Sequence, residues 1–165
     1  LNILIDTPKS KEYAENEVFM EKTNKQHFEI LLFYYGKQCF AIPFHYVKKV
    51  IAPIESTPLP HIAPYVEGLI NLQGEILPLI SLEKLFQIAD KDEGEKRWII
   101  CQLGPNRFAL EVGFVSDIVG VGHDMVDLKA ERNQPLIYGE VVLEKRAYSI
   151  FDVEAFVKMV QENHG

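Results

Sequence analysis

Histidine and cysteine side chains are the first candidates for metal binding or nucleophilic chemistry. The five histidines have no i, i+4 spacing within a predicted helix, and Cys39 and Cys101 form no C-x-x-C pair. Both cysteines fall in predicted strands, where no adjacent cation or helix N-terminus would stabilise a thiolate. We therefore predict buried, unreactive thiols, no metal site and no disulfide framework, as in a reducing cytoplasm.

Local catalytic motifs are also absent from the sequence. G-x-S-x-G, H-E-x-x-H and the phosphate-binding P-loop pattern do not occur. Gly120 and Gly122 lack the third glycine of a dinucleotide fingerprint, and the acidic stretch around Asp92 lacks a calcium-loop pattern, so we interpret it as a solvated turn. We predict no cofactor, no catalytic residue and no enzyme, although carboxylates brought together by the fold would not show in a sequence.

Net charge and hydropathy disfavour two classes of partner, nucleic acids and membranes. The chain has 165 residues, of which 47% are hydrophobic, and 17 Lys and Arg against 24 Asp and Glu give a net charge of −7. This acidic balance disfavours nucleic acid and anionic membrane surfaces, both of which attract clustered cations. The longest apolar runs, residues 30–35 and 76–80, are far shorter than the roughly 18 residues of a spanning helix. We therefore predict neither a nucleic-acid partner nor direct membrane insertion.

The spacing and frequency of apolar residues change at His27. Residues 1–26 contain few apolar side chains, and Ser10 is placed to cap a short helix, so we interpret them as an N-terminal extension that is partly helical. From residue 27 onward, short apolar runs rich in β-branched and aromatic residues are typical of strands. The sequence thus predicts one mainly β domain over residues 27–165.

Three stretches are predicted to be connections. Four of the nine prolines fall within residues 52–64, which indicates a stiff loop. Residues 87–96 and 123–134 are polar, and we expect both to be exposed.

An internal repeat divides the domain into two copies. Two alignments of the chain with itself match apolar positions and turns while keeping the period-2 spacing of strands. Chance similarity between amphipathic strand pairs is the alternative. The first alignment places Phe40 on Phe108, Val47 on Val115 and Val50 on Ile118, and the second places Gly68 on Gly139 and Leu79 on Ile150.

The repeat predicts an architecture. Each copy of about 60 residues holds four or five short strands, which we expect to curl into a small barrel, with the two barrels packed into one unit. Ser81 and Asp152 precede helix-spaced apolar residues at equivalent positions, so each is predicted to cap a short helix. The second of these helices ends the chain.

The segment from residue 60 to 86 carries a recognisable pattern. Its run PYVEGLINLQGEILPLI, at residues 64–80, resembles the signature of CheW-like proteins, and the resemblance extends over about residues 27–160. It implies two intertwined five-stranded SH3-like β-barrels with short helices. It also implies a non-enzymatic adaptor, located in the cytoplasm and recruited to membrane receptor arrays, that couples the cytoplasmic tip of chemoreceptors to the regulatory domain of a CheA-type histidine kinase. A groove between the lobes would suit an amphipathic receptor helix.

Six positions match contact positions of the family, and the resemblance implies that they bind protein partners. At two of them the chain departs from the family, because many relatives carry Glu in place of Lys49 and Arg in place of Gln73. Gly113 replaces a frequent Asp, and the sequence assigns no consequence to that change. The six positions are Val47, Lys49, Val50, Gly68, Gln73 and Ile76.

Several interpretations stay open at this point. Lys49 and Gln73 indicate either altered partner choice or neutral drift, because an exposed ion pair contributes about 0–1 kcal/mol. Val47 and Val50 have apolar repeat mates, which favours core packing over partner contact. The alternatives in function are a scaffold of a divergent chemosensory pathway, such as one for surface motility, and a small-molecule sensor or enzyme that uses the cleft between the lobes.

Overall fold

The computed structural model describes residues 27–60, 62–128 and 133–163. The predicted N-terminal extension, residues 1–26, lies outside them. Within the described residues the chain forms twelve strands, two α-helices and two 3₁₀ helices. They are β1 (His27–Tyr35), β2 (Gln38–Pro43), η1 (Phe44–Tyr46), β3 (Val47–Ile51), β4 (Ser56–Thr57), β5 (Val66–Leu72), β6 (Glu75–Ser81), α2 (Leu82–Leu85), β7 (Arg97–Leu103), β8 (Asn106–Val112), β9 (Val115–Gly122), η2 (His123–Met125), β10 (Val126–Asp127), β11 (Ile137–Leu143), β12 (Arg146–Phe151) and α3 (Val153–Asn163).

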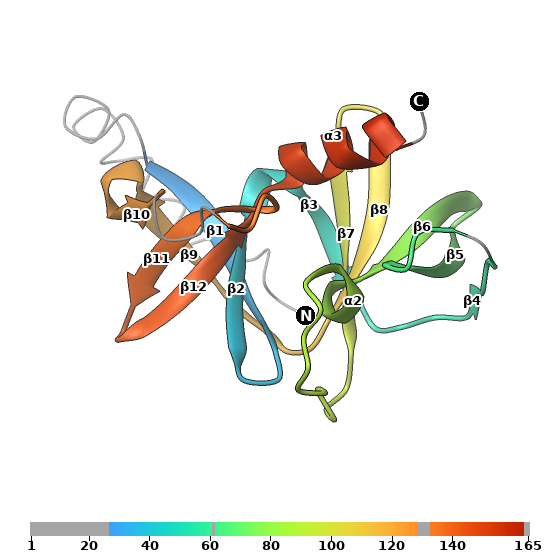
Figure 1. Ribbon diagram of the computed structural model, residues 1–165, viewed down its shortest axis with the longest axis horizontal. Helices are drawn as coiled ribbons and strands as arrows, with labels where there is room; N and C mark the ends of the chain where they lie inside the picture. Colours follow the sequence, from blue (N-terminus) through green and yellow to red (C-terminus); the bar gives the residue numbers. More distant parts are fainter. Residues whose placement is uncertain (1–26, 61, 129–132, 164–165) are drawn as a thin grey trace.

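The strands form two sheets, and each sheet contains strands from both repeat copies (Figure 1). The first sheet has the order β10-β11-β12-β2-β1-β9, and the second has the order β3-β7-β8-β6-β5-β4. Each described sheet therefore contains five strands of five or more residues and one two-residue strand. The mainly β, two-unit fold predicted from the sequence is confirmed.

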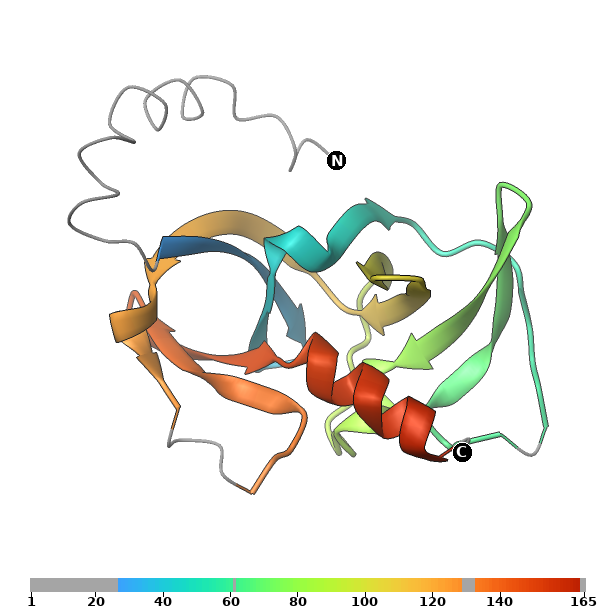
Figure 2. The same cartoon turned by 90° about the horizontal axis from the view of Figure 1, so that it is seen from above.

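The prediction that each copy forms its own barrel is wrong. The hairpin β1–β2 belongs to the first copy but lies in the sheet of β9–β12, and the hairpin β7–β8 of the second copy lies in the sheet of β3–β6. The intertwining implied by the family resemblance is what the strand order shows, and Figure 2 shows the chain passing twice between the units.

Strand register reproduces the repeat in detail. The two repeat alignments relate the parallel pairing of β6 with β8 to that of β12 with β2, and the antiparallel pairing of β7 with β3 to that of β1 with β9. Chance similarity does not explain matched registers in two separate sheets. The matched pairs are Leu79–Ala109 with Ile150–Ala41, and Ile99–Val50 with Leu31–Ile118.

Three apolar clusters hold the fold together. A small cluster lies in each sheet, around Ile150 in the first and Trp98 in the second. The largest cluster takes residues from both sheets and from α3, including Phe33, Ile99 and Phe156. The region between the lobes, predicted to be a docking groove, is thus in large part filled by the chain's own side chains. Figure 2 shows α3 extending from the junction of the two units along the unit of β3–β8.

Both predicted helix caps are present. Ser81 Oγ accepts a hydrogen bond from the Lys84 backbone N–H at 3.1 Å, at the start of α2. Asp152 Oδ1 accepts from the Ala155 N–H at 2.9 Å, at the start of α3. Each cap satisfies a backbone donor that the first helical turn leaves without a partner.

The two connections predicted to be exposed are exposed over most of their described residues, but all three predicted connections differ in detail from the sequence interpretation. Residues 123–127 form η2 and β10, and Ser56 and Thr57 form β4 within the proline-rich loop. In residues 87–96, Ile88 is buried, and the side chain of Asp92 is only 13% exposed.

Asp92 joins its own segment, residues 92–96, to the turn at Gly36. Its Oδ2 accepts from the Gly36 N–H and its Oδ1 from the Gly94 N–H, both at 2.8 Å, and Lys96 Nζ lies 3.5 Å from Oδ1. A Cβ on Gly113 would lie 2.1 Å from Asp92 Oδ2, so the glycine leaves room for this carboxylate. The interpretation of Asp92 as part of a solvated turn is wrong, because its partners are backbone groups that a sequence does not reveal.

We expect Asp92→Asn to destabilise the protein by about 2 kcal/mol at pH 7, the scale of hydrogen bonds to a charged group. Although burial opposes ionisation, the Gly36 and Gly94 hydrogen bonds and Lys96 hold the pKa of Asp92 below its ordinary value of 3.8. Its contribution is therefore present above pH 4 and is lost as the pH falls through the folded-state pKa. Urea unfolding of both proteins from pH 7 to pH 3 measures this, and a difference that stays constant with pH would contradict it.

Candidate protein-binding site

The six positions expected to contact partners lie in the sheet of β3–β8 or, for Gln73, in its β5–β6 turn. They form two groups. Val47, Lys49 and Val50 lie on β3, while the other three lie on the β5–β6 hairpin, and β7 and β8 separate the two groups in the strand order. The structure therefore does not bring all six together along the sheet.

On β3, Val47 and Val50 pack against the shared apolar cluster and are half-buried. Val50 pairs with Ile99, as its repeat mate Ile118 pairs with Leu31. These contacts favour the core-packing interpretation of the two valines. β3 is an edge strand of the described sheet, so the same strand has one side free for other contacts.

Gly68 is buried under β4. A Cβ at this position would lie 2.3 Å from the carbonyl oxygen of Thr57, far inside a normal contact distance. Its repeat mate Gly139 faces β10 in the same way, because a Cβ there would lie 2.7 Å from Val126 Cγ1. The structure therefore gives Gly68 a packing role: it lets β4 approach β5.

We expect Gly68→Ala to lower the free energy of unfolding by about 1–3 kcal/mol, because β4 must move away from β5 to admit the methyl group. Backbone amide hydrogen exchange at Thr57 and Leu69 should accelerate, since these residues pair between the two strands. Gly104→Ala, in a turn where a Cβ would meet nothing within 4 Å but φ is +58°, separates conformational strain from crowding. Unchanged exchange in β4 of Gly68→Ala would contradict the crowding argument.

The β5–β6 hairpin presents Gln73 and Ile76 to solvent. Leu72 pairs with Glu75, so the loop consists of Gln73 and Gly74, and both have positive φ, 53° and 89°. This backbone matches the type I′ turn of two-residue hairpins. Ile76 follows, with 56% of its surface exposed.

An ion pair fixes the hairpin to the neighbouring strand. Arg107 Nη1 on β8 donates to Glu75 Oε1, which lies next to Ile76. Lys49 lies on the edge strand β3 and Gln73 in the β5–β6 turn, and no hydrogen bond joins their side chains within the described residues.

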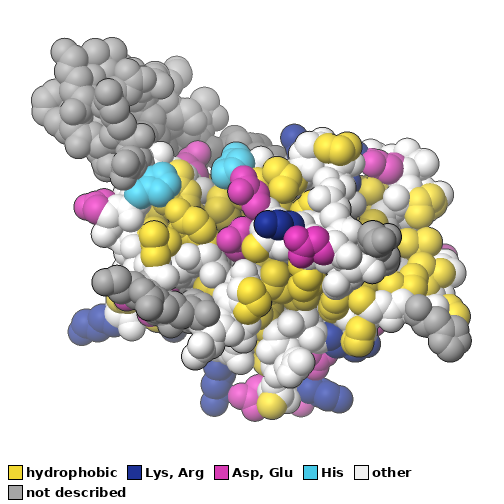
Figure 3. Space-filling view, turned by 45° about the horizontal axis from the view of Figure 1, so that its top comes forward, with side chains coloured by type: hydrophobic (Ala, Val, Ile, Leu, Met, Phe, Trp, Pro, Cys, Tyr) yellow, Lys and Arg dark blue, Asp and Glu magenta, His cyan; other side chains and the backbone are white. Residues whose placement is uncertain are grey.

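Two further exposed apolar residues escaped the sequence interpretation. Ile54 and Ile62 flank β4 in the proline-rich loop, with 43% and 40% of their surfaces exposed. The sequence feature that could have identified them is an apolar side chain in a segment without strand or helix periodicity. Such a segment has no regular apolar side that packs against a core. Figure 3 shows hydrophobic side chains gathered on the right of the view, over the unit that contains β4, β5 and β6.

The titratable groups show structural roles. Tyr46, in η1 just before β3, donates to Glu154 Oε1 on α3 at 3.3 Å, and burial together with this carboxylate raises the pKa of Tyr46 to about 12. Burial raises the pKa of the Cys101 thiol well above its ordinary range, as expected of an unreactive thiol. Cys39 is half-buried, so the prediction that it is buried is wrong.

Within residues 27–60, 62–128 and 133–163, no three His, Cys, Asp or Glu side chains come together as a metal site. In the same residues, no helix has the length and apolar character needed to span a bilayer.

Comparison with known proteins adds to this geometry. A family model described as a CheW-like domain matches residues 29–161, which is most of the chain and both sheets. The chain belongs to the CheW-like domain family. The recognition made from the signature stretch is thereby confirmed.

Curated relatives of this CheW-like chain are named chemotaxis protein CheW. The one from Thermotoga maritima is 33% identical over 97 residues, which cover 58% of this chain and 62% of the relative. The one from Helicobacter pylori is 25% identical over 142 residues, which cover 84% and 86%. The chain thus spans slightly less than two thirds of the Thermotoga maritima relative and of the Treponema pallidum relative, at 62% and 64%.

A solved structure shares the CheW-like fold. It is the scaffolding protein TtCheW from Thermoanaerobacter tengcongensis, with a TM-score of 0.71 at 21% identity over 76% of this chain and 84% of that one. The likeness shows that the two-sheet fold of this chain is shared by that protein.

Proposed function

We propose that this CheW-like chain is a non-enzymatic adaptor that couples chemoreceptors to a CheA-type histidine kinase. The family match over residues 29–161 carries the proposal, because it covers both sheets and the shared core between them. The chain would work in the cytoplasm, recruited to membrane receptor arrays by the receptor's cytoplasmic tip.

The sheet of β3–β8 supplies the docking residues in this proposal. Ile76 and Gln73 on the hairpin are exposed and held in place by the ion pair between Glu75 and Arg107. Lys49 adds a cation on the edge strand β3. Gly68 acts indirectly, by setting the position of β4 against β5.

Reconstitution tests the proposal. The purified chain is mixed with the cytoplasmic fragment of a receptor and the histidine kinase encoded in the same genome, and kinase autophosphorylation is measured with and without the chain. We expect the chain to bind both proteins and to raise kinase activity in the presence of receptor. Failure to bind either partner at near-physiological salt would reject the adaptor function.

Lys49 and Gln73 support a second candidate, a scaffold of a divergent chemosensory pathway. The two positions carry neither the Glu nor the Arg that the family resemblance implies, which changes the local charge presented to a partner. The double variant Lys49→Glu, Gln73→Arg is expected to gain affinity for the kinase regulatory domain of a standard chemotaxis system. No gain in affinity would leave the departure from the family as neutral drift.

A further inference from the structure

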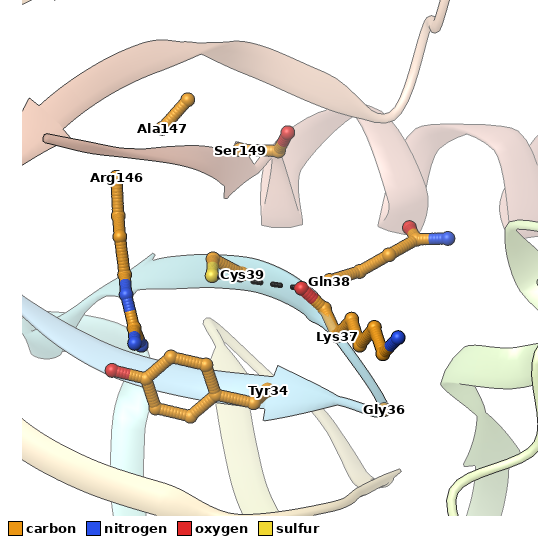
Figure 4. Close-up of a pocket in the computed structure, with 8 residues that line it drawn as sticks. All are labelled: Tyr34, Gly36, Lys37, Gln38, Cys39, Arg146, Ala147 and Ser149. Carbon is orange, nitrogen blue, oxygen red and sulfur yellow. Dashed lines mark hydrogen bonds between the residues drawn. The ribbon is translucent and has the colours of Figure 1, made fainter.

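An open pocket of about 680 Å³ lies in the sheet of β1, β2 and β9–β12. It lies just ahead of Phe40 and Ser149, where the parallel pairing of β2 with β12 begins. Figure 4 shows Arg146 and Lys37 at opposite ends of the lining. The lining residues are Tyr34, Gly36, Lys37, Gln38, Cys39, Arg146, Ala147 and Ser149.

The repeat shows what occupies the equivalent place in the other sheet. The first repeat alignment places Cys39 on Arg107, and the second places Glu75 on Arg146. Arg107 and Glu75 form an ion pair there, which bridges β8 and β6. In the first sheet the same two positions hold a thiol and a guanidinium, so this bridge has no counterpart.

The pocket carries positive charge without a bound acid. Within the described residues, neither Arg146 nor Lys37 forms an ion pair. The carboxylate of Asp92 reaches the lining at the Gly36 N–H, 2.8 Å away, but its other oxygen is held by the Gly94 N–H. Asp92 is therefore already engaged in joining backbone segments.

Hydroxyl groups lie beside the cations, at and behind the lining residue Tyr34. The hydroxyl of Tyr34 lies 3.0 Å from that of Tyr148 and 3.3 Å from Ser116 Oγ. Burial, together with the hydrogen bond to Tyr34, raises the pKa of Tyr148 to about 12. The Tyr148 hydroxyl therefore stays protonated at neutral pH and adds no negative charge that would repel an anion.

We propose that this pocket binds a small organic carboxylate, with Arg146 as its principal partner and Lys37 as a second cation. The planar guanidinium offers two parallel N–H donors to a carboxylate, and the volume lies within the roughly 300–1,000 Å³ of small-molecule sites. In the related sheet, Glu75 and Arg107 neutralise each other's charge. Arg146 has no such protein partner among the described residues, and a bound carboxylate would neutralise it instead. Cations at both ends of the lining favour a dicarboxylate.

The site is separate from the proposed docking residues. Those lie in the sheet of β3–β8, whereas this pocket lies in the other sheet, and none of its lining residues belongs to the apolar cluster that the two sheets share. The inference therefore does not depend on the adaptor function.

Nuclear magnetic resonance titration of the whole chain tests the site. Succinate is the probe, sodium chloride at matched ionic strength is the blank, and inorganic phosphate is the competing anion. We expect saturable shifts at the backbone amides of Lys37, Cys39 and Ala147. Arg146→Ala should weaken succinate binding at least about tenfold, and Arg146→Lys should fall between it and the parent, because Lys keeps the charge without the fork.

Lys48→Ala is the matched control, since Lys48 is an exposed cation on β3 in the other sheet. It should bind succinate as the parent does. Shifts that do not saturate, or equal affinity in Arg146→Ala, would overturn the proposal. Phosphate that binds more tightly than succinate at the same amides would overturn the assignment to carboxylates.

Discussion

Phe156→Ala is expected to destabilise the protein by about 3–5 kcal/mol, more than Asp92→Asn or Gly68→Ala. Phe156 lies on α3 with 2% of its surface exposed, and its ring lies 5.0 Å from that of Phe108 and 5.8 Å from that of Phe151. Phe108 belongs to one sheet and Phe151 to the other, so truncation opens a cavity where the two units and the helix meet.

Urea unfolding at pH 7, followed by fluorescence of Trp98 and by circular dichroism, measures this effect. Trp98 reports on the small cluster of the second sheet, whereas circular dichroism reports on both sheets. Lys158→Ala, on the exposed side of the same helix, should change stability by less than about 0.5 kcal/mol. A loss below about 1 kcal/mol for Phe156→Ala would show that α3 does not hold the two units together.

Ile76→Ala is expected to weaken binding to the proposed kinase or receptor partner about thirtyfold, or about 2 kcal/mol, while stability stays within about 0.5 kcal/mol. The side chain is 56% exposed, so its truncation removes little core packing. The Arg107–Glu75 ion pair holds the hairpin on which it stands, which limits the ordering cost of docking.

Val142→Ala is the control for that experiment. Val142 is 60% exposed on β11 of the other sheet, so it matches Ile76 in exposure but not in location. Isothermal titration calorimetry of both variants against the same partner separates a specific contact from general surface hydrophobicity. Equal losses in the two variants, or no loss in Ile76→Ala, would remove the hairpin from the docking surface.

Much of the fold follows from local sequence patterns. Alternating apolar residues mark the strands, the two repeat alignments indicate that the copies present their buried faces in the same order, and Ser81 and Asp152 mark both helix starts. These features depend on residues close in sequence or on direct comparison of the copies, which is why they can be predicted.

The exchange of hairpins does not follow from the repeat. β1 pairs with β9, which lies in the second copy, and a hairpin with the same apolar faces could as well pair within its own copy. The choice depends on how the connections run in three dimensions, so the family resemblance predicted it and the strand pattern did not.

The candidate site was predictable to a lesser extent. Its six residues were taken from the family resemblance. The sequence alone does not show that Gly68 is buried under β4 or that the aliphatic side chain of Ile76 is exposed. The carboxylate of Asp92 and the pocket beside Arg146 depend on backbone groups and strands that lie far apart in the sequence. A sequence shows the side chains but not the main-chain donors that they meet.

The exchanged hairpins have a consequence for the order of synthesis. When β1 and β2 leave the ribosome, the strands that flank them in the finished sheet, β9 and β12, are still to be translated. The β1–β2 hairpin therefore has unpaired strand edges until nearly the whole domain has been translated. During this time the nascent chain is prone to misassociation. If the gene were cut between the copies, the hairpin β1–β2 would lack β9 and β12, and the hairpin β7–β8 would lack β3 and β6. Neither half would then be able to complete a sheet by itself.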